Sequence, residues 1–239
     1  MLNYLLWGAL LAGAAPLAVR AQVAPAAQVR PLPPFRAIQV GGTIALTITA
    51  GHAQRVEVSA ATADFREHLV TKVEDGVLLL SYDDLLERDD RKLMKADHQL
   101  RVAVTADFIT KLTATGGATV TSTSNFVAPD CLIDASSAAS VVASGLAPRV
   151  LVVRESTKAT VTLAGTAPRL DVRANSGATF DGRQLQSATC QVEANDGSTI
   201  RVYATEDLLL EANSNAKVYY YGPATITKNL NGGSAASAN

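Results

Sequence analysis

Apolar and polar residues alternate with a period of two along most of this chain, a pattern typical of β-strands with one buried face. Between residues 36 and 82 the alternating runs are short and are separated by glycine-containing turns such as Gly41-Gly42. This stretch predicts several strands of about five residues each. The alternation resumes at Leu100, Val102 and Val104.

Downstream of about residue 105 the alternation becomes a repeat. One large apolar residue recurs at steps of 21, 20, 19, 20 and 18 residues. These anchor residues are Val120, Val141, Val161, Phe180, Ile200 and Val218. Six copies at nearly constant spacing predict an architecture of stacked units.

Equivalent positions of the copies predict how each unit folds. The residues eight and ten before the anchor are apolar in almost every copy and alternate with largely polar ones, which predicts one strand; a second short strand begins at the anchor. Corners follow it, for example at Ala147-Pro148-Arg149 and Ala167-Pro168-Arg169. A helix-free unit of this size buries its apolar face only against other copies, so we expect an all-β parallel β-solenoid, or β-helix, of about 20 residues per coil. The general preference of crossover connections predicts a right-handed one.

The turn between the two strands also repeats. The position three before the anchor holds glycine or asparagine in four of six copies, which predicts a tight turn with a left-handed residue. Polar residues five before the anchor are expected to hydrogen-bond along the stack. They are Thr115, Ser136, Ser156, Asn175, Asn195 and Asn213. The alternative fold, a β-sandwich with regular strand spacing, does not predict such matching columns.

The N-terminus predicts export. Residues 1–21 combine an apolar run too short to span a bilayer with a small-residue exit before Gln22, which indicates a secretory signal peptide. No Lys or Arg precedes the run, so a retained anchor or an unprocessed tail is the alternative. We expect the mature protein in the periplasm, at the cell surface or secreted.

Three segments fall outside the strand pattern. Residues 22–34 contain four prolines, which cannot donate to a ladder, and predict an extended linker. Residues 83–98 carry charges of both signs and predict a solvated loop. Residues 231–239 predict a disordered tail. A single β-solenoid domain is expected over 35–230, with N-terminal strands at 35–104 and repeats at 105–227.

The net charge and the cysteine positions limit which partners and which disulfides can be expected. The 239 residues carry a formal net charge of −1, which gives no reason to expect nucleic acid or an anionic membrane surface as a partner. Cys131 and Cys190 occupy the same column three copies apart, about 14 Å along the axis, too far for a disulfide. We therefore predict two buried free thiols.

The sequence offers little reaction chemistry. His52, His68 and His98 lie outside the repeats and have no neighbouring residues at metal-ligand spacing, so we expect no metal, cofactor or catalytic residues. A polysaccharide-active β-helix would need carboxylates or bases gathered on one outward face. The outward column here is Asp134, Arg154, Arg173, Glu193 and Glu211. Opposite charges meet there at two of four steps, which favours surface ion pairing over a catalytic row.

The best binding candidates lie in the last copies. Arg183, Tyr203 and Tyr221 fall in one outward column, and Arg201 and Tyr219 fall in another. Tyrosine rings beside arginine can stack on sugar rings or form a protein-binding hot spot. Alternatively, the tyrosines at 219–221 cover the last apolar layer of the stack.

Several segments together resemble a known family. They are Phe35-Arg36-Ala37-Ile38-Gln39-Val40-Gly41-Gly42, then Ile44-Ala45-Leu46-Thr47-Ile48, then Val77-Leu78-Leu79-Leu80-Ser81-Tyr82, followed by the Ser-Gly-Ala-Thr-like phrases of the repeats. Over residues 35–228 the chain resembles the GIN-domain family, the putative auto-transporter adhesin head domain of exported Bacteroidetes proteins. The resemblance implies a β-helical, exported, nonenzymatic domain, suggests adhesion by name and carries over no catalytic residues. Ser137-Ala138 and Thr157-Lys158 depart from the usual Ser-Gly pair, which argues against a left-handed turn in those two copies.

These observations favour a noncatalytic envelope or surface protein, peripheral to the membrane at most, that binds a surface glycan or an envelope protein. A polysaccharide-active enzyme and a purely structural scaffold are the alternatives. The sequence does not indicate an oligomeric state.

Overall fold

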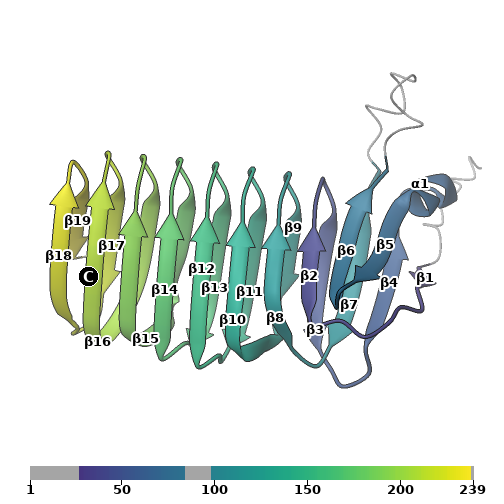
Figure 1. Cartoon of the computed structure of the whole chain (residues 1–239), viewed down its shortest axis with the longest axis horizontal. Coiled ribbons are helices and arrows are strands. Elements are labelled where there is room, and N and C mark those ends of the chain that lie inside the picture. The colour runs from purple at the N-terminus through teal and green to yellow at the C-terminus, as the bar shows by residue number, and fades with distance from the viewer. Residues whose placement is uncertain (1–26, 84–97, 238–239) are drawn as a thin grey trace, which may run out of the picture.

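The computed structural model describes residues 27–83 and 98–237. Its nineteen strands form one hydrogen-bonded system that runs along a single long axis (Figure 1). The predicted parallel β-solenoid is confirmed. The predicted signal peptide at 1–21 and nearly all of the charged loop at 83–98 lie outside the described residues.

The N-terminal part contains seven strands and a short helix. Thr62 caps the helix, its hydroxyl accepting a hydrogen bond from the Phe65 backbone N–H at 3.1 Å. The elements are β1 (Gln28–Val29), β2 (Ala37–Val40), β3 (Ala45–Ala50), β4 (Arg55–Ser59), α1 (Ala63–Glu67), β5 (Leu69–Glu74), β6 (Val77–Tyr82) and β7 (Arg101–Ala106).

The repeats supply the remaining strands. Two of these strands, β15 and β16, are long because each continues from one coil into the next without a break. The strands are β8 (Ile109–Ala114), β9 (Thr119–Ser122), β10 (Val127–Ala135), β11 (Ser140–Leu146), β12 (Val150–Glu155), β13 (Thr160–Thr166), β14 (Arg169–Ala174), β15 (Thr179–Ala194), β16 (Thr199–Asn213), β17 (Lys217–Tyr221), β18 (Thr225–Asn231) and β19 (Ser234–Ser237).

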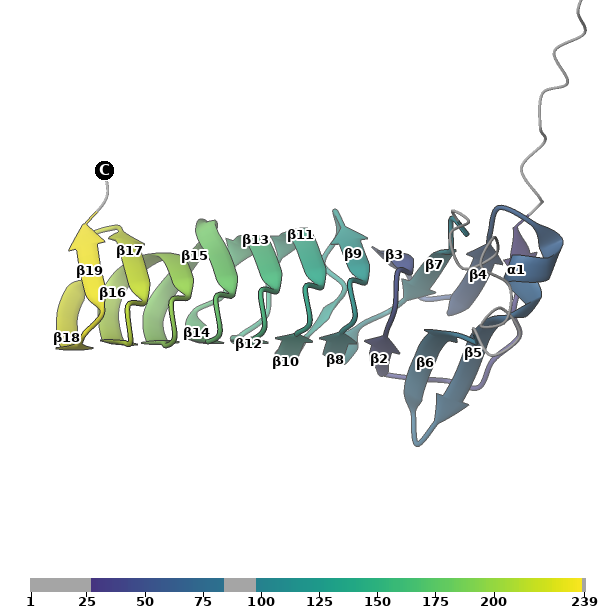
Figure 2. The ribbon, with the colours of Figure 1, turned by 90° about the horizontal axis from the view of Figure 1, so that it is seen from above.

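The coils stack in parallel to form two opposed faces (Figure 2). The β8 face contains β6, β2, β8, β10, β12, β14, the second halves of β15 and β16, and β18. The β9 face contains β7, β3, β9, β11, β13, the first halves of β15 and β16, β17 and β19. Tight turns join the faces along one edge, the turn edge, and wider corners join them along the other, the corner edge.

The first coil in the sequence is not the first in the stack. Strands β2 and β3 lie between the β6–β7 coil and the β8–β9 coil, because β2 pairs with both β6 and β8 and β3 pairs with both β7 and β9. Three antiparallel strands end the stack beyond β6 and β7: β5 pairs with β6, β4 with β7 and β1 with β4. These strands protect the N-terminal edges from pairing with another chain.

The core follows the predicted columns. Eight positions before the anchor, Leu112, Ile133, Val153, Val172, Val192 and Leu210 pair in direct register and are all buried. Cys131 and Cys190 share another column with Leu151 and Leu170 between them. Both thiols are free and buried, as predicted, and burial raises the pKa of each to about 12.

The tight turns are left-handed in every repeat, including the two where the sequence argued against it. Ser137 and Ala138 have φ of 54° and 61°, and Thr157 and Lys158 have φ of 51° and 61°. With two left-handed central residues these are type I′ turns. Hydrogen bonds along the stack hold them: the Ala138 N–H donates to the Thr157 carbonyl at 2.9 Å, and the Lys158 N–H to the Ser176 carbonyl at 3.1 Å. That prediction was wrong because neighbouring coils impose a conformation that the local residues disfavour.

The structure also corrects both ends of the folded part. Gln28 and Val29 pair with β4, and the Arg30 N–H donates to the Val56 carbonyl at 2.9 Å, so the expected linker is already in a ladder from residue 28. At the other end β19 pairs with β17, so the expected disordered tail contributes half of the last coil. Prolines at 31, 33 and 34 delimit the linker, but one strand fits ahead of them.

Candidate functional site

The predicted binding residues Arg183, Arg201, Tyr203, Tyr219 and Tyr221 lie on the outer side of the β9 face, at its C-terminal end; we call them the Arg–Tyr face. Arg201 is directly opposite Tyr219 in the register, and Tyr203 is opposite Tyr221. The three tyrosines and Arg201 are partly exposed. Strand register therefore brings one Arg–Tyr pair and one Tyr–Tyr pair together, as the columns predicted.

Electrostatic contacts organise this face. The Arg201 guanidinium carbon lies 5.3 Å from the centre of the Tyr219 ring, in cation–π range. Arg183 forks onto Asp181, with Nε 2.9 Å from Oδ1 and Nη2 2.6 Å from Oδ2. The Arg183 guanidinium holds the pKa of the Asp181 carboxyl below its usual value, and the carboxylate raises the pKa of Arg183.

Arg183 lies on the Arg–Tyr face but not in the predicted register position. The β15–β16 register shifts between Gly182 and Gln186, so Gln186 rather than Arg183 pairs with Tyr203. Arg183 nevertheless lies near Tyr221, whose hydroxyl contributes to its raised pKa. The predicted column was wrong at this residue because residues 183–185 have no register partner in β16, so the pairing resumes only at Gln186.

The alternative role predicted for the three successive tyrosines applies to one of them. Tyr220 points inward and packs against the core cluster, whereas Tyr219 and Tyr221 alternate with it and face outward. One tyrosine thus covers apolar residues, and the other two remain available to a ligand.

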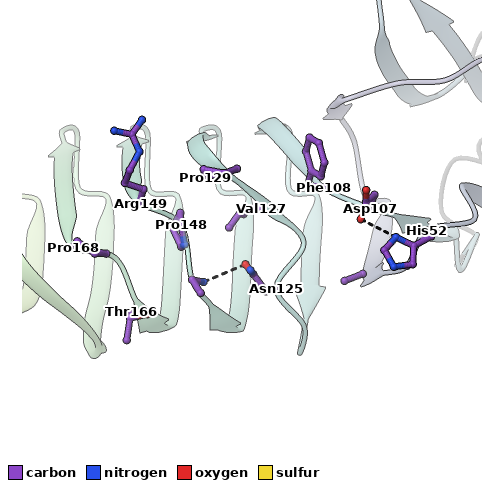
Figure 3. A pocket seen from close by; sticks show the side chains of 13 residues that line it. His52, Asp107, Phe108, Asn125, Val127, Pro129, Pro148, Arg149, Thr166 and Pro168 are labelled. Carbon is purple, nitrogen blue, oxygen red and sulfur yellow. Dashed lines mark hydrogen bonds and ion pairs between the residues drawn. The ribbon is translucent and has the colours of Figure 1, made fainter.

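A second feature lies along the corner edge, where an open groove of about 680 Å³ crosses several coils (Figure 3); we call it the corner groove. Its apolar lining comes from Phe108, Val127 and three prolines, Pro129, Pro148 and Pro168. Pro148 and Pro168 were expected at corners from the sequence, whereas Pro129 was not. Their convergence depends on stacking, so the groove itself was not predicted.

Polar groups in the corner groove are held by local contacts. The His52 Nδ1 lies 3.3 Å from the Asp107 Oδ1 at the N-terminal end. The Arg149 Nη2 donates to the Asp130 Oδ1 at 2.8 Å farther along. In the middle, the Asn125 Oδ1 accepts from the Ala147 backbone N–H at 3.1 Å.

The outward charge column on the β8 face pairs in part. Arg173 lies 3.8 Å from Glu193 and 3.4 Å from Asp171, so one of the two predicted steps forms an ion pair. Asp134 and Arg154 are register neighbours, but no ion pair joins them within the described residues. The column makes exposed pairs, and such pairs contribute little to stability.

The histidines divide between two environments. The side chain of His52 is 97% exposed. His68 and His98 are partly buried instead, packed with Phe65 and Tyr82 at ring-centre distances of 4.4 to 6.2 Å. No group of three His, Cys, Asp or Glu side chains suited to a metal ion occurs in residues 27–83 and 98–237. Across the same residues, no helix has the length and apolar character needed to cross a membrane.

The chain was compared with known proteins and solved structures. It matches the family model described as "Putative auto-transporter adhesin, head GIN domain" over residues 34–224. No curated protein matches it.

Several crystal structures share its fold. A putative adhesin from Bacteroides fragilis is 18% identical with a TM-score of 0.74, over 89% of this chain and 95% of that chain. A putative lipid binding protein from Parabacteroides distasonis is 15% identical with a TM-score of 0.67, over 91% and 98%. A putative adhesin from Parabacteroides merdae is 14% identical with a TM-score of 0.65, over 90% and 96%. With the fold shared over the whole solenoid and the family model matching most of its length, the chain belongs to the adhesin-head GIN-domain family.

Proposed function

We propose that this protein is a noncatalytic exported protein of the cell envelope or surface that binds a glycan or another surface component through the Arg–Tyr face. The observation that carries the proposal is the pairing of Arg201 with Tyr219 and of Tyr203 with Tyr221 on one outer face. Partly exposed aromatic rings beside guanidinium groups suit stacking on sugar rings and hydrogen bonding to their hydroxyls.

Export is supported by two independent features. The family is named for auto-transporter adhesins, which act outside the cytoplasm. Residues 1–21 carry the apolar run and small-residue exit of a secretory signal peptide. A surface location also suits an elongated solenoid, which presents long flat faces to its surroundings.

The main alternative is a polysaccharide-active enzyme. It would need an accessible acid–base pair. The outward carboxylate Glu193 instead lies beside Arg173. Among residues 27–83 and 98–237, Glu155 is the carboxylate with a strongly raised pKa, and it is buried in the core. A purely structural scaffold is the third candidate, and it predicts no ligand for the Arg–Tyr face.

A glycan array run beside a reducing-end release assay on the same sugars separates the three candidates. We expect array binding without product. The double variant Tyr203→Ala, Tyr219→Ala should lower binding at least about tenfold, since each stacking contact contributes roughly 1 kcal/mol. The matched control is Val142→Ala. Val142 is exposed on the β9 face but does not belong to the Arg–Tyr face, so this variant should bind normally.

Other outcomes decide against the proposal. Sugar release would favour the enzyme. Absence of both glycan binding and sugar release would favour the purely structural scaffold. Unchanged binding by the double variant, with a melting temperature equal to that of the wild type, would place the binding site elsewhere.

A further inference from the structure

We propose that the corner groove is a second binding site, which takes a neutral oligosaccharide lying along the solenoid axis. The proposal goes beyond the Arg–Tyr face, because the groove lies on the corner edge and shares no residue with that face. Its volume of about 680 Å³ falls in the range of small-ligand sites, and its mixture of apolar walls and a few polar groups is typical of them.

The groove is a consequence of how the corners are built. Pro148 and Pro168 lie between strands, in the corners that join β11 to β12 and β13 to β14. Pro129 lies within β10, where the register with β8 shifts, and also lines the groove. Strands β15 and β16 instead run through their corners as continuous strands, and the groove ends at Pro168 where β15 follows. At the other end it is bounded by His52, after β3, and Asp107, after β7 (Figure 3).

The groove offers a rigid apolar floor. Pro129 and Pro168 are exposed, and their rings fix the backbone beneath them. Phe108 adds a partly exposed aromatic ring, held by the Arg36 guanidinium carbon 4.7 Å from its centre. An aromatic ring beside apolar surface suits the apolar face of a sugar ring, since such side chains provide large contact area with little conformational freedom to lose.

Hydrogen-bonding groups surround this floor. The Asn125 Oδ1 is already used by the Ala147 N–H at 3.1 Å, which fixes the amide so that its NH₂ group remains as a donor. Thr166 contributes an exposed hydroxyl from the end of β13. The His52 Nδ1 faces Asp107, so its Nε2 is the ring atom left for a ligand. An amide, a hydroxyl and an imidazole are groups that bind sugar hydroxyls.

Charge selects against an ionic ligand. His52 faces Asp107 at 3.3 Å, and Arg149 donates to Asp130 at 2.8 Å, so each basic group in the groove is matched by its own carboxylate. An anionic or cationic ligand would have to displace one partner of a pair. A neutral ligand leaves both pairs intact.

Backbone pairing favours a sugar over a peptide. Extended peptides are commonly bound by adding a strand to a free sheet edge. Here the corner groups already bond along the stack: the Arg149 N–H donates to the Pro129 carbonyl at 2.7 Å, and the Ile109 N–H to the Phe126 carbonyl at 2.7 Å. Phe108 and Pro168 adjoin β8 and β14, which are three coil steps or about 14 Å apart. This length requires several linked sugar rings.

The test uses the full chain and linear neutral gluco-, manno- and xylo-oligosaccharides of one to six rings, with affinity measured by calorimetry. We expect affinity to rise with chain length and then level off. Ala147→Trp, at an exposed lining residue in the middle of the groove, should abolish binding in the groove by filling it, and combined with Tyr203→Ala and Tyr219→Ala it should leave no neutral-sugar binding. His52→Ala should weaken binding severalfold, and Phe108→Ala at least about tenfold. Because Phe108 also contacts Arg36, melting temperatures are compared for every variant.

The double variant Tyr203→Ala, Tyr219→Ala is the matched control and should retain groove binding, which keeps the two sites distinguishable. Loss of neutral-sugar binding in the double variant, with normal binding in Ala147→Trp, would overturn the groove and support the Arg–Tyr face. No neutral oligosaccharide binding by the wild type, or tighter binding of a charged sugar or a peptide at the groove, would also overturn it.

Discussion

Two neighbouring coils share one backbone shape although their sequences suit it unequally. In the β14–β15 coil the left-handed turn residues are Ser176 and Gly177, and in the β12–β13 coil they are Thr157 and Lys158. A β-branched residue followed by lysine is costly in this conformation, by roughly 1 kcal/mol or more per residue. The stack therefore imposes the turn on a coil whose own sequence disfavours it.

A buried residue of the β12–β13 coil also suits its position less well than the equivalent residue of the β14–β15 coil. The residue that ends the first strand is Ala174 in one coil and Glu155 in the other, and both are buried. Neither carboxyl oxygen of Glu155 has a hydrogen-bond partner. Burial raises the pKa of Glu155 from 4.5 to about 9, so the side chain is neutral at pH 7. The comparison marks the β12–β13 coil as the weak layer of the solenoid.

Of the substitutions in these two coils, replacing the Glu155 carboxyl should change the free energy of unfolding most. Every other repeat has alanine at the equivalent position: Ala114, Ala135, Ala174, Ala194 and Ala212. Glu155→Ala should therefore fit the existing packing and raise the free energy of unfolding at pH 8 by up to about 5 kcal/mol, at 1.4 kcal/mol per pH unit above the unfolded-state pKa of 4.5. Denaturant unfolding measures the change.

The raised pKa of Glu155 also predicts the direction in which stability changes with pH. Between pH 4.5 and about 9 the folded state keeps the Glu155 proton and the unfolded state has lost it, so wild-type stability should fall as pH rises through this window. No other acidic or basic side chain is buried in the described core besides the two cysteine thiols, which titrate higher. Glu155→Ala should flatten the slope. An unchanged slope would mean that the carboxyl finds water or a partner in the folded state.

Exchanging the turn residues should give a smaller effect. Lys158→Gly should stabilise the protein by about 1 kcal/mol, since glycine adopts the left-handed conformation without a Cβ clash. Gly177→Lys should destabilise it by a similar amount; the nearest atom to a Cβ built there is the Lys158 Cγ at 3.9 Å, so strain and not collision sets the cost. Thermal unfolding of both variants tests this. Equal stability of all three proteins would show that stacking fully compensates for the turn sequence.

The smallest effect concerns the polar column beside the turns. The Asn213 Nδ2 donates to the Asn195 Oδ1 at 2.9 Å, so Asn213→Ala should cost about 0.5 to 1 kcal/mol. Asn175 is exposed and makes no side-chain hydrogen bond to the described residues, so Asn175→Ala should be neutral within about 0.5 kcal/mol. Chemical denaturation of the pair checks whether the predicted ladder stabilises only where a bond forms.

The columns of the sequence predicted much of this molecule. They predicted the parallel solenoid, the inward positions, the separation of the two cysteines and the pairing of Arg201 with Tyr219, because a period repeated six times fixes which residues stack. Glu155 was not predicted to matter; it interrupts an alanine column that the sequence contains, but only its burial shows the consequence.

The sequence by itself determined the repeat and the alternation within each coil, since both depend on local spacing. Only the tertiary structure decided the order of the first coils, the left-handed turn at Thr157-Lys158 and the corner groove. Each of these depends on contacts between segments distant in the chain: β2 and β3 lie between β6–β7 and β8–β9, and hydrogen bonds from the next coil hold a disfavoured turn. The alternation of apolar and polar residues thus determined which residues stack, and the stacking determined the shape of the two edges.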